Sequence, residues 1–288
     1  MKQRVITGFF FTLGVLAFVV PAYWFPLIMT LFAVIVGGVA FYEMIKALKA
    51  GDMEPSVPLM VSGGVLSIVL FALSYLMDIS LWASLCLYSV VALIFAMACV
   101  IIPSIFRKEG NHLHDGLITA ASFLYITFPM FCLCAVAAIP EHGWFYMVPA
   151  LASAWVSDVF AYFTGVTLGK HKIVPHISPK KTWEGCIGGA VCCAATIAVY
   201  FDIVIYDMVG ITINKYLFTV FAFALGFMIS VMSQLGDWLA SLVKRRVGIK
   251  DYGNIFPGHG GMLDRFDSVF FTVPTGVLLA LAAIYFTK

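Results

Sequence analysis

Long runs of apolar residues recur along the whole chain and are separated by short polar segments. A helix rises 1.5 Å per residue, so about 20 apolar residues cross the hydrocarbon core of a bilayer, which is about 30 Å thick. Runs of roughly that length cover residues 5–21, 23–44, 57–77, 80–103, 117–139, 145–168, 185–206, 217–239 and 268–287. The pattern predicts an all-α polytopic membrane protein with about nine transmembrane helices.

The composition agrees with this fold class. Hydrophobic residues make up 62% of the chain and charged residues 11%, whereas soluble proteins carry about 25% charged residues to cover themselves in water. A soluble enzyme, a secreted domain and a disordered chain are therefore excluded. The formal net charge of +2 is close to zero, and we predict no nucleic-acid partner.

The distribution of basic residues predicts the topology. Cytoplasmic loops of membrane proteins retain Lys and Arg. With nine spans, all but two of the 17 Lys and Arg residues fall on the same side as the N-terminus, and the exceptions are Lys215 and Lys288. We therefore expect the N-terminus inside, the C-terminus outside, and the long loops 169–184 and 240–268 in the cytoplasm.

Side chains capable of chemistry concentrate in the second half of the chain. We therefore predict an N-terminal transmembrane scaffold of about five helices, residues 1–140, and a C-terminal catalytic region, residues 141–288, that includes both long loops. Glu43 is the one acid of the first half that looks buried. Because it stands near the inner end of its span, we expect its side chain to reach the membrane interface.

Two spans carry polar residues at membrane depth. Asp158 lies near the middle of its span, where an ionised carboxylate costs several kcal/mol and is a functional candidate, whereas the nearby Gly165 and Gly169 are expected to pack against another helix. The span 217–239 presents an aligned polar face because its polar residues are three or four positions apart. They are Gln234, Asp237, Ser241 and Lys244.

The loop that follows combines cations, glycines and acids. Lys244, Arg245, Arg246 and Lys250 offer donors to phosphate oxygens, and the glycines allow backbone amides to approach an anion. Asp264 and Asp267, three residues apart, could share a hard divalent cation. These are the groups that phosphoryl transfer requires. A patch that attracts anionic lipid headgroups would explain the cations, but not the acids and the glycines.

Residues 241–267 read SLVKRRVGIKDYGNIFPGHGGMLDRFD and closely resemble the signature of the phosphatidate cytidylyltransferases. The residues in register with that signature are Ser241, Lys244, Arg245, Lys250, Asp251, Gly253, Phe256, Pro257, His259, Gly260, Gly261, Asp264, Arg265 and Asp267. Similarity extends to Gln234, Gly236 and Asp237 and to the segment 178–185.

The resemblance implies an Mg²⁺-dependent enzyme that converts CTP and phosphatidate to CDP-diacylglycerol and pyrophosphate. It implies catalytic residues Asp237, Lys244, Asp264 and Asp267, of which the three acids would hold the metal. The substrate-binding residues expected beside them are Asp158, Lys180, Lys181, Thr182, Ser241, Arg245, Lys250, His259, Gly260 and Gly261. The family also suggests a homodimer in the bacterial inner membrane with its active site facing the cytoplasm.

Three other functions remain open at this point. An ion-coupled transporter would also use Asp158 and Asp237 at membrane depth, although the chain lacks the paired broken helices of many transporters. A lipid-binding scaffold would need only the basic loops. Within the enzyme class, a related cytidylyltransferase could accept a different lipid phosphate, since the signature reports phosphate chemistry and not acyl chains.

Overall fold

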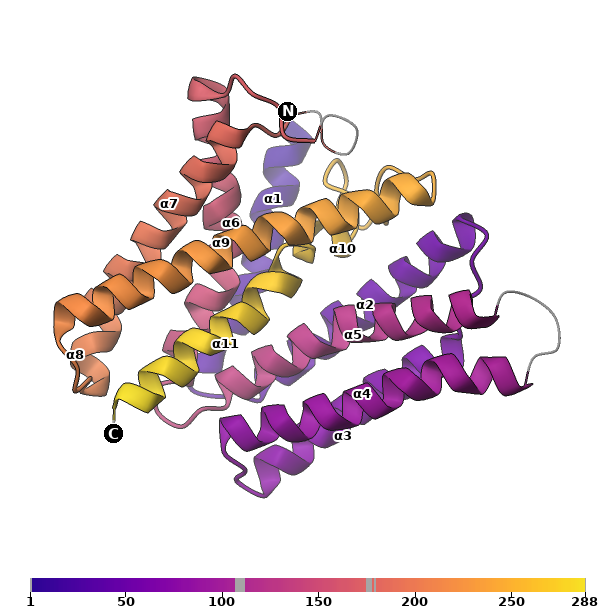
Figure 1. The fold of residues 1–288 in the computed structure, drawn as a ribbon, viewed down its shortest axis with the longest axis horizontal. Coiled ribbons are helices and arrows are strands. Elements are labelled where there is room, and N and C mark those ends of the chain that lie inside the picture. The colour runs from indigo at the N-terminus through magenta and orange to yellow at the C-terminus, as the bar shows by residue number, and fades with distance from the viewer. Residues whose placement is uncertain (1, 107–111, 175–177, 179, 288) are drawn as a thin grey trace. The chain divides into compact units, whose positions relative to one another are not determined.

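The computed structural model describes residues 2–106, 112–174, 178 and 180–287, and all regular structure in that part of the chain is helical. Outside the helices it contains two isolated β-bridges, Lys172 with Thr182 and Phe256 with Gly260. Nine helices in the described ranges are long and apolar enough to cross a membrane. Each overlaps one predicted span, so the predicted all-α polytopic fold is confirmed (Figure 1).

The predicted sidedness of the loops stays a prediction. It rests in part on Arg107, Lys108 and Lys288, which lie outside the described residues. Pro179, within the signature-like segment 178–185, also lies outside them.

The chain forms two compact units. The first unit consists of Met1–Ile139 and Lys244–Phe266, and the second of Pro140–Val243 and Asp267–Lys288. The first contains α1 (Lys2–Val19), η1 (Pro21–Tyr23), α2 (Ile28–Ala50), α3 (Val57–Leu76), α4 (Leu81–Phe106), α5 (His112–Ala137) and α10 (Leu263–Phe266). The second contains α6 (Gly143–Leu168), α7 (Trp183–Tyr200), η2 (Phe201–Ile205), α8 (Tyr206–Val209), α11 (Val269–Phe286) and most of α9 (Lys215–Arg246).

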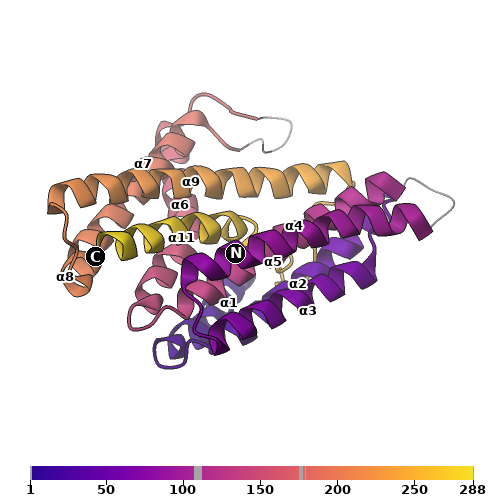
Figure 2. The ribbon, with the colours of Figure 1, turned by 60° about the horizontal axis from the view of Figure 1, so that its bottom comes forward.

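Helix α5 is central to the first unit, because α2, α3 and α4 all pack against it (Figures 1 and 2). The Tyr88 ring of α4 stacks on Phe131 of α5 with ring centroids 4.1 Å apart. Its hydroxyl donates a 2.7 Å hydrogen bond to Thr127. Burial of a tyrosine at membrane depth is tolerated here because its polar end has a partner.

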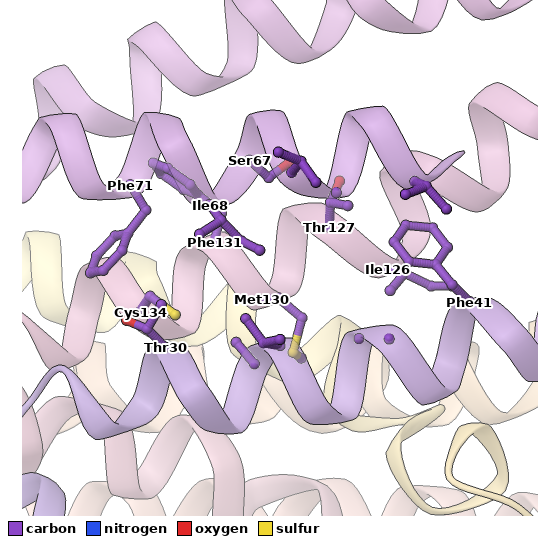
Figure 3. Close-up of a pocket in the computed structure, with 17 residues that line it drawn as sticks. Thr30, Phe41, Ser67, Ile68, Phe71, Ile126, Thr127, Met130, Phe131 and Cys134 are labelled. Carbon is purple, nitrogen blue, oxygen red and sulfur yellow. The ribbon is translucent and has the colours of Figure 1, made fainter. Parts of the chain in front are cut away.

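An apolar groove of about 330 Å³ lies between α2 and α3, which pack more extensively on α5 than on each other (Figure 3). Phe41 of α2 and Met130 of α5 are among its lining residues. The hydroxyls of Ser67 and Thr127, which also line it, donate to carbonyls of their own helices. Those two hydroxyls therefore need no partner from within the groove.

The segment 247–266 packs with the N-terminal helices of the first unit. The Phe11 ring of α1 meets the rings of Phe256 and Phe266 at 5.3 and 5.7 Å, and Phe32 of α2 meets Phe266 at 5.8 Å. Most of the signature thus belongs to the same compact unit as residues 1–139. That residues 1–140 are scaffold and residues 141–288 catalytic stays a functional prediction, but the two parts are not separate packing units.

The second unit is held together by close approach of helices that carry small residues. A Cβ on Gly189 of α7 would lie 2.8 Å from the Cβ of Ala161 on α6. An added Cβ on Gly165 or Gly169 would lie 3.2 or 2.7 Å from the Thr182 hydroxyl. The predicted packing role of these two glycines is confirmed.

Two further contacts complete this bundle. Helix α11 packs on α6, where an added Cβ on Gly276 would come within 2.5 Å of the Cβ of Ala150. Helices α6 and α9 are joined by a buried 2.6 Å hydrogen bond between the hydroxyls of Ser157 and Ser230. Small residues and hydroxyl pairs are the usual means of helix association in a membrane, where water provides no hydrophobic driving force.

The packing of α6 on α7 generates a stability prediction. Gly189→Ala forces the two backbones apart and is expected to cost about 1–3 kcal/mol of stability, as overpacking does. Gly14→Ala is the matched control, because a Cβ on Gly14 of α1 meets nothing within 4 Å. Thermal unfolding in detergent, followed by tryptophan fluorescence, should show a lower melting temperature for Gly189→Ala only. Equal melting temperatures would contradict the packing described.

Candidate active site

The residues 247–262, here named the signature loop, connect the end of α9 to α10. Three glycines in it have positive φ: Gly248 at 74°, Gly258 at 76° and Gly260 at 83°. Side chains with a Cβ adopt that region at a cost, so glycine is favoured at these positions. The turn around Gly258 is closed by the amide of Phe256, which donates a 2.9 Å hydrogen bond to the carbonyl of Gly260.

The carboxylate of Asp264, at the start of α10, organises the loop from within. Its side chain is 4% exposed. Oδ1 accepts a 2.7 Å hydrogen bond from Lys244 Nζ, and Oδ2 accepts from the amides of Tyr252 at 2.8 Å and Gly261 at 2.9 Å. A Cβ on Gly260 would lie 2.6 Å from Oδ2. Two separated stretches of the loop and the end of α9 are thereby joined by one side chain.

Lys244 is correspondingly fixed. Its side chain is 13% exposed, its ammonium pairs with Asp264, and it lies 5.4 Å from the centroid of the Tyr252 ring. A lysine that is paired with an acid and lies against an aromatic ring samples fewer rotamers than a solvent-exposed lysine does. The neighbouring Arg245 is exposed in the last turn of α9, and Ser241 is partly buried one turn earlier.

Glu43 of α2 contradicts the expectation that its side chain reaches the membrane interface. It is only 2% exposed. Oε1 accepts a 3.0 Å hydrogen bond from the amide of Met262, and Oε2 accepts a 2.8 Å bond from the amide of Leu263. The expectation was wrong because Glu43 has partners 219 and 220 residues away in the chain, which a local reading of α2 cannot reveal.

A polar cavity of about 600 Å³ opens on the signature loop. Three of the residues that line it, Lys250, His259 and Arg265, can carry positive charge. The Nε of Arg265 is buried and makes no hydrogen bond within the described residues. The three possible cations outnumber the one acid that also lines the cavity, Asp251, so the cavity is suited to an anion.

Sequence reasoning did not select Arg265 as a site residue. The available signal was its position between Asp264 and Asp267 in the signature. Lys250, His259 and Gly260, which were selected, all line this cavity, and Gly261 donates its amide to Asp264.

The second unit brings together another group of the predicted residues. A cavity of about 450 Å³ is lined by Asp158, Lys180, Lys181, Thr182 and others, including Gln234. Lys181 forms an ion pair with Asp237 of α9 and lies 5.6 Å from the centroid of the Trp238 ring. The loop 169–184 is thus attached to the polar face predicted for this helix.

The side chain of Thr182 caps α7. Its hydroxyl accepts a 3.2 Å hydrogen bond from the amide of Gly185, and the residue is 5% exposed. This contact gives Thr182 a structural reason to be present. Its predicted contact with substrate stays a prediction.

Asp267 precedes Ser268, the N-cap residue of α11, and is 8% exposed. Its Oδ1 accepts a 2.7 Å hydrogen bond from the amide of Ser268. A Cβ on Gly236 would lie 2.7 Å from the carbonyl oxygen of Asp267, so the Asp267 backbone lies beside the residue that precedes Asp237. Within the described residues, no three His, Cys, Asp or Glu side chains form a group that could hold a metal ion by themselves.

Comparison with known proteins identifies the family. A family model described as the cytidylyltransferase family matches residues 2–283. The chain belongs to this cytidylyltransferase family. The match spans both compact units and so includes Glu43 as well as the signature.

Several bacterial relatives of this chain carry the name phosphatidate cytidylyltransferase. The one from Bacillus subtilis is 33% identical over 275 residues, which cover 95% of each chain. The one from Mycobacterium bovis is 32% identical over 237 residues, covering 80% of this chain and 73% of the relative. The one from Staphylococcus haemolyticus is 33% identical over 244 residues, covering 75% and 90%.

The contacts of Asp264 generate a prediction about the loop. Asp264→Asn replaces an acceptor oxygen by an NH₂ group that must face either Lys244 or backbone amides, and a buried mismatch of this kind costs about 1–3 kcal/mol. The signature loop should therefore be cut faster by a protease in the folded protein. Asp251→Asn, an exposed acid of the same loop, is the control. Equal cleavage rates in the two variants would contradict the role of Asp264.

Proposed function

We propose that this protein transfers the cytidylyl group of CTP to phosphatidate, giving CDP-diacylglycerol and pyrophosphate, in phospholipid biosynthesis. The observation that carries the proposal is the match to the Bacillus subtilis phosphatidate cytidylyltransferase over 95% of both chains. The nine candidate spans among the described residues support a substrate that resides in the membrane.

The reaction requires positioning and charge rather than an enzyme nucleophile. A phosphate oxygen of phosphatidate attacks the α-phosphorus of CTP, the bond between that phosphorus and the bridging oxygen to the β-phosphate breaks, and pyrophosphate leaves with those electrons. Two polyanions must approach one another, and negative charge grows on the leaving group. Preorganised cations lower that barrier because they need no rearrangement as the charge develops.

The first unit supplies such cations. Lys244, held by Asp264, offers an ammonium in a defined position, while Lys250 and Arg265 line the polar cavity of the signature loop. We assign phosphate binding to these three because each offers a cationic donor in or beside the signature loop. In the second unit, Lys180 and Lys181 line the cavity of about 450 Å³ and are proposed to contact substrate as well.

Mg²⁺ is part of the proposal, and the available carboxylates fit it in part. Mg²⁺ prefers oxygen ligands and commonly uses one or two carboxylates together with substrate phosphates. Asp237 and Asp267 both belong to the second unit, and the Asp267 backbone lies beside Gly236. When bound, Mg²⁺ would supply positive charge that stabilises the leaving pyrophosphate.

Asp264 fits less directly. Its two oxygens already accept three hydrogen bonds, so only one of about four acceptor positions, on Oδ1, remains for a metal ion. Its place among the metal ligands rests on its three-residue spacing from Asp267 and on the resemblance.

We further propose that the active site faces the cytoplasm, where CTP is available, and that the protein lies in a bacterial inner membrane. The asymmetry of Lys and Arg along the chain and the bacterial origin of the relatives support this. A homodimer stays a prediction from the resemblance.

The direct test is product formation by the purified protein. Labelled CTP, phosphatidate and Mg²⁺ should yield a lipid-extractable nucleotide. Lys244→Ala removes a preorganised cation and should lower kcat/KM about a hundredfold, the scale seen for loss of one transition-state contact. Lys49→Ala, an exposed lysine at the end of α2, should leave kcat/KM unchanged.

If the wild-type protein forms no labelled lipid, the proposed reaction is wrong. A labelled lipid formed only when another lipid phosphate replaces phosphatidate would identify a related cytidylyltransferase. Equal losses in Lys244→Ala and Lys49→Ala would favour a general electrostatic patch for anionic lipid.

The metal assignment has its own test. Asp237→Asn and Asp267→Asn should lower turnover strongly and raise the Mg²⁺ concentration for half-maximal activity, because each removes a proposed charged ligand. Asp251→Asn should keep the wild-type Mg²⁺ dependence. Titrations of turnover against Mg²⁺ measure both quantities, and unchanged half-maximal concentrations in all three variants would exclude Asp237 and Asp267 as ligands.

A further inference from the structure

Glu43 is a buried acid that the proposed reaction does not use. It stands on α2, in the N-terminal half of the chain, and its two oxygens accept hydrogen bonds from the consecutive amides of Met262 and Leu263. These amides form the entrance to α10, the helix that carries Asp264 and Arg265. Glu43 therefore contacts the junction between the signature loop and α10.

Two glycines of the signature loop lie directly against this carboxylate. A Cβ on Gly253 or on Gly261 would collide with Glu43 Oε1. Neither glycine has a positive φ, so backbone conformation does not require glycine at these two positions. The close approach of Glu43 leaves no room for a Cβ and therefore requires glycine at both positions. Two positions of the signature thus depend on a residue outside it.

The geometry also explains why the residue is an acid. The two neighbouring N–H donors each meet a separate acceptor oxygen, and a carboxylate provides both. A glutamine provides one oxygen and one NH₂ group, so one backbone amide would face another donor. Hydrogen bonds to an ionised acceptor are the stronger kind, and they compensate a charge that is removed from water.

We propose that Glu43 is a positioning residue for phosphate transfer: by holding the amides of Met262 and Leu263, it sets the place of Asp264 and through it the ammonium of Lys244. The proposal rests on the proposed function for its kinetic part only. The link from Glu43 to Asp264 runs through two residues of backbone, and the link from Asp264 to Lys244 is the 2.7 Å ion pair. Glu43 itself touches no substrate in this scheme.

The test uses the full-length protein and the variant Glu43→Gln, which keeps the size of the side chain. Hydrogen–deuterium exchange without substrate should be faster in peptides that cover residues 252–264. The kcat for labelled CTP and phosphatidate should fall roughly tenfold to a hundredfold, the scale expected for loss of a charged hydrogen bond. Faster exchange does not depend on which reaction the protein catalyses, so a failure of the proposed function leaves this part of the test intact.

Asp115→Asn is the matched control. Asp115 of α5 also accepts a hydrogen bond from a distant backbone amide, that of Glu54 at 3.2 Å, but it lies outside the signature. It should leave exchange of residues 252–264 and kcat unchanged.

A double-variant cycle separates positioning from a merely structural role. If Glu43 acts through Lys244, then adding Glu43→Gln to Lys244→Ala should lower kcat little further, because the group being positioned is already absent. Wild-type loop exchange in Glu43→Gln would overturn the proposal. So would wild-type kcat in that variant, or losses that multiply in the double variant.

Discussion

A carboxylate that is removed from water must find donors within the protein, and this requirement shapes the signature loop. Glu43 and Asp264 are both nearly inaccessible to solvent, and together they accept hydrogen bonds from the amides of Tyr252, Gly261, Met262 and Leu263 and from Lys244. Breaking one such contact leaves a buried charge partly uncompensated, which is costly in a low dielectric. The loop is therefore held by these two acids as well as by apolar packing.

This arrangement gives the N-terminal helices a part in the site. Aromatic rings of α1 and α2 pack on Phe256 and Phe266, and Glu43 holds the start of α10. The first unit thus combines apolar spans, which suit a membrane, with a loop that presents cations. In the second unit, Lys181 pairs with Asp237 and lines the cavity that Asp158 also lines. In each unit, a lysine proposed to bind phosphate is placed by an acid.

Much of this organisation could be predicted from the sequence. The nine spans follow from apolar run length, because the bilayer imposes a single thickness on every crossing. The signature residues follow from spacing and resemblance.

What could not be predicted were contacts between residues far apart in the chain. Nothing in the sequence of α2 indicates that Glu43 contacts the signature loop. The sequence around Thr182 fits a ligand-binding hydroxyl as well as it fits a helix cap. Arg265 stands in the signature. Its place in the lining of the cavity, and the lack of a hydrogen-bond partner for its Nε among the described residues, are known only from the structure.

The central claim is that the signature loop, positioned by buried acids, binds the phosphates of the nucleotide. The most direct measurement is photocrosslinking of the membrane-embedded protein with a CTP analogue that carries a photoreactive group on its γ-phosphate, followed by peptide mapping. We expect labelling within residues 244–265, in competition with unlabelled CTP. Labelling confined to other segments, such as residues 51–56 between α2 and α3, in a preparation that turns over CTP, would contradict it.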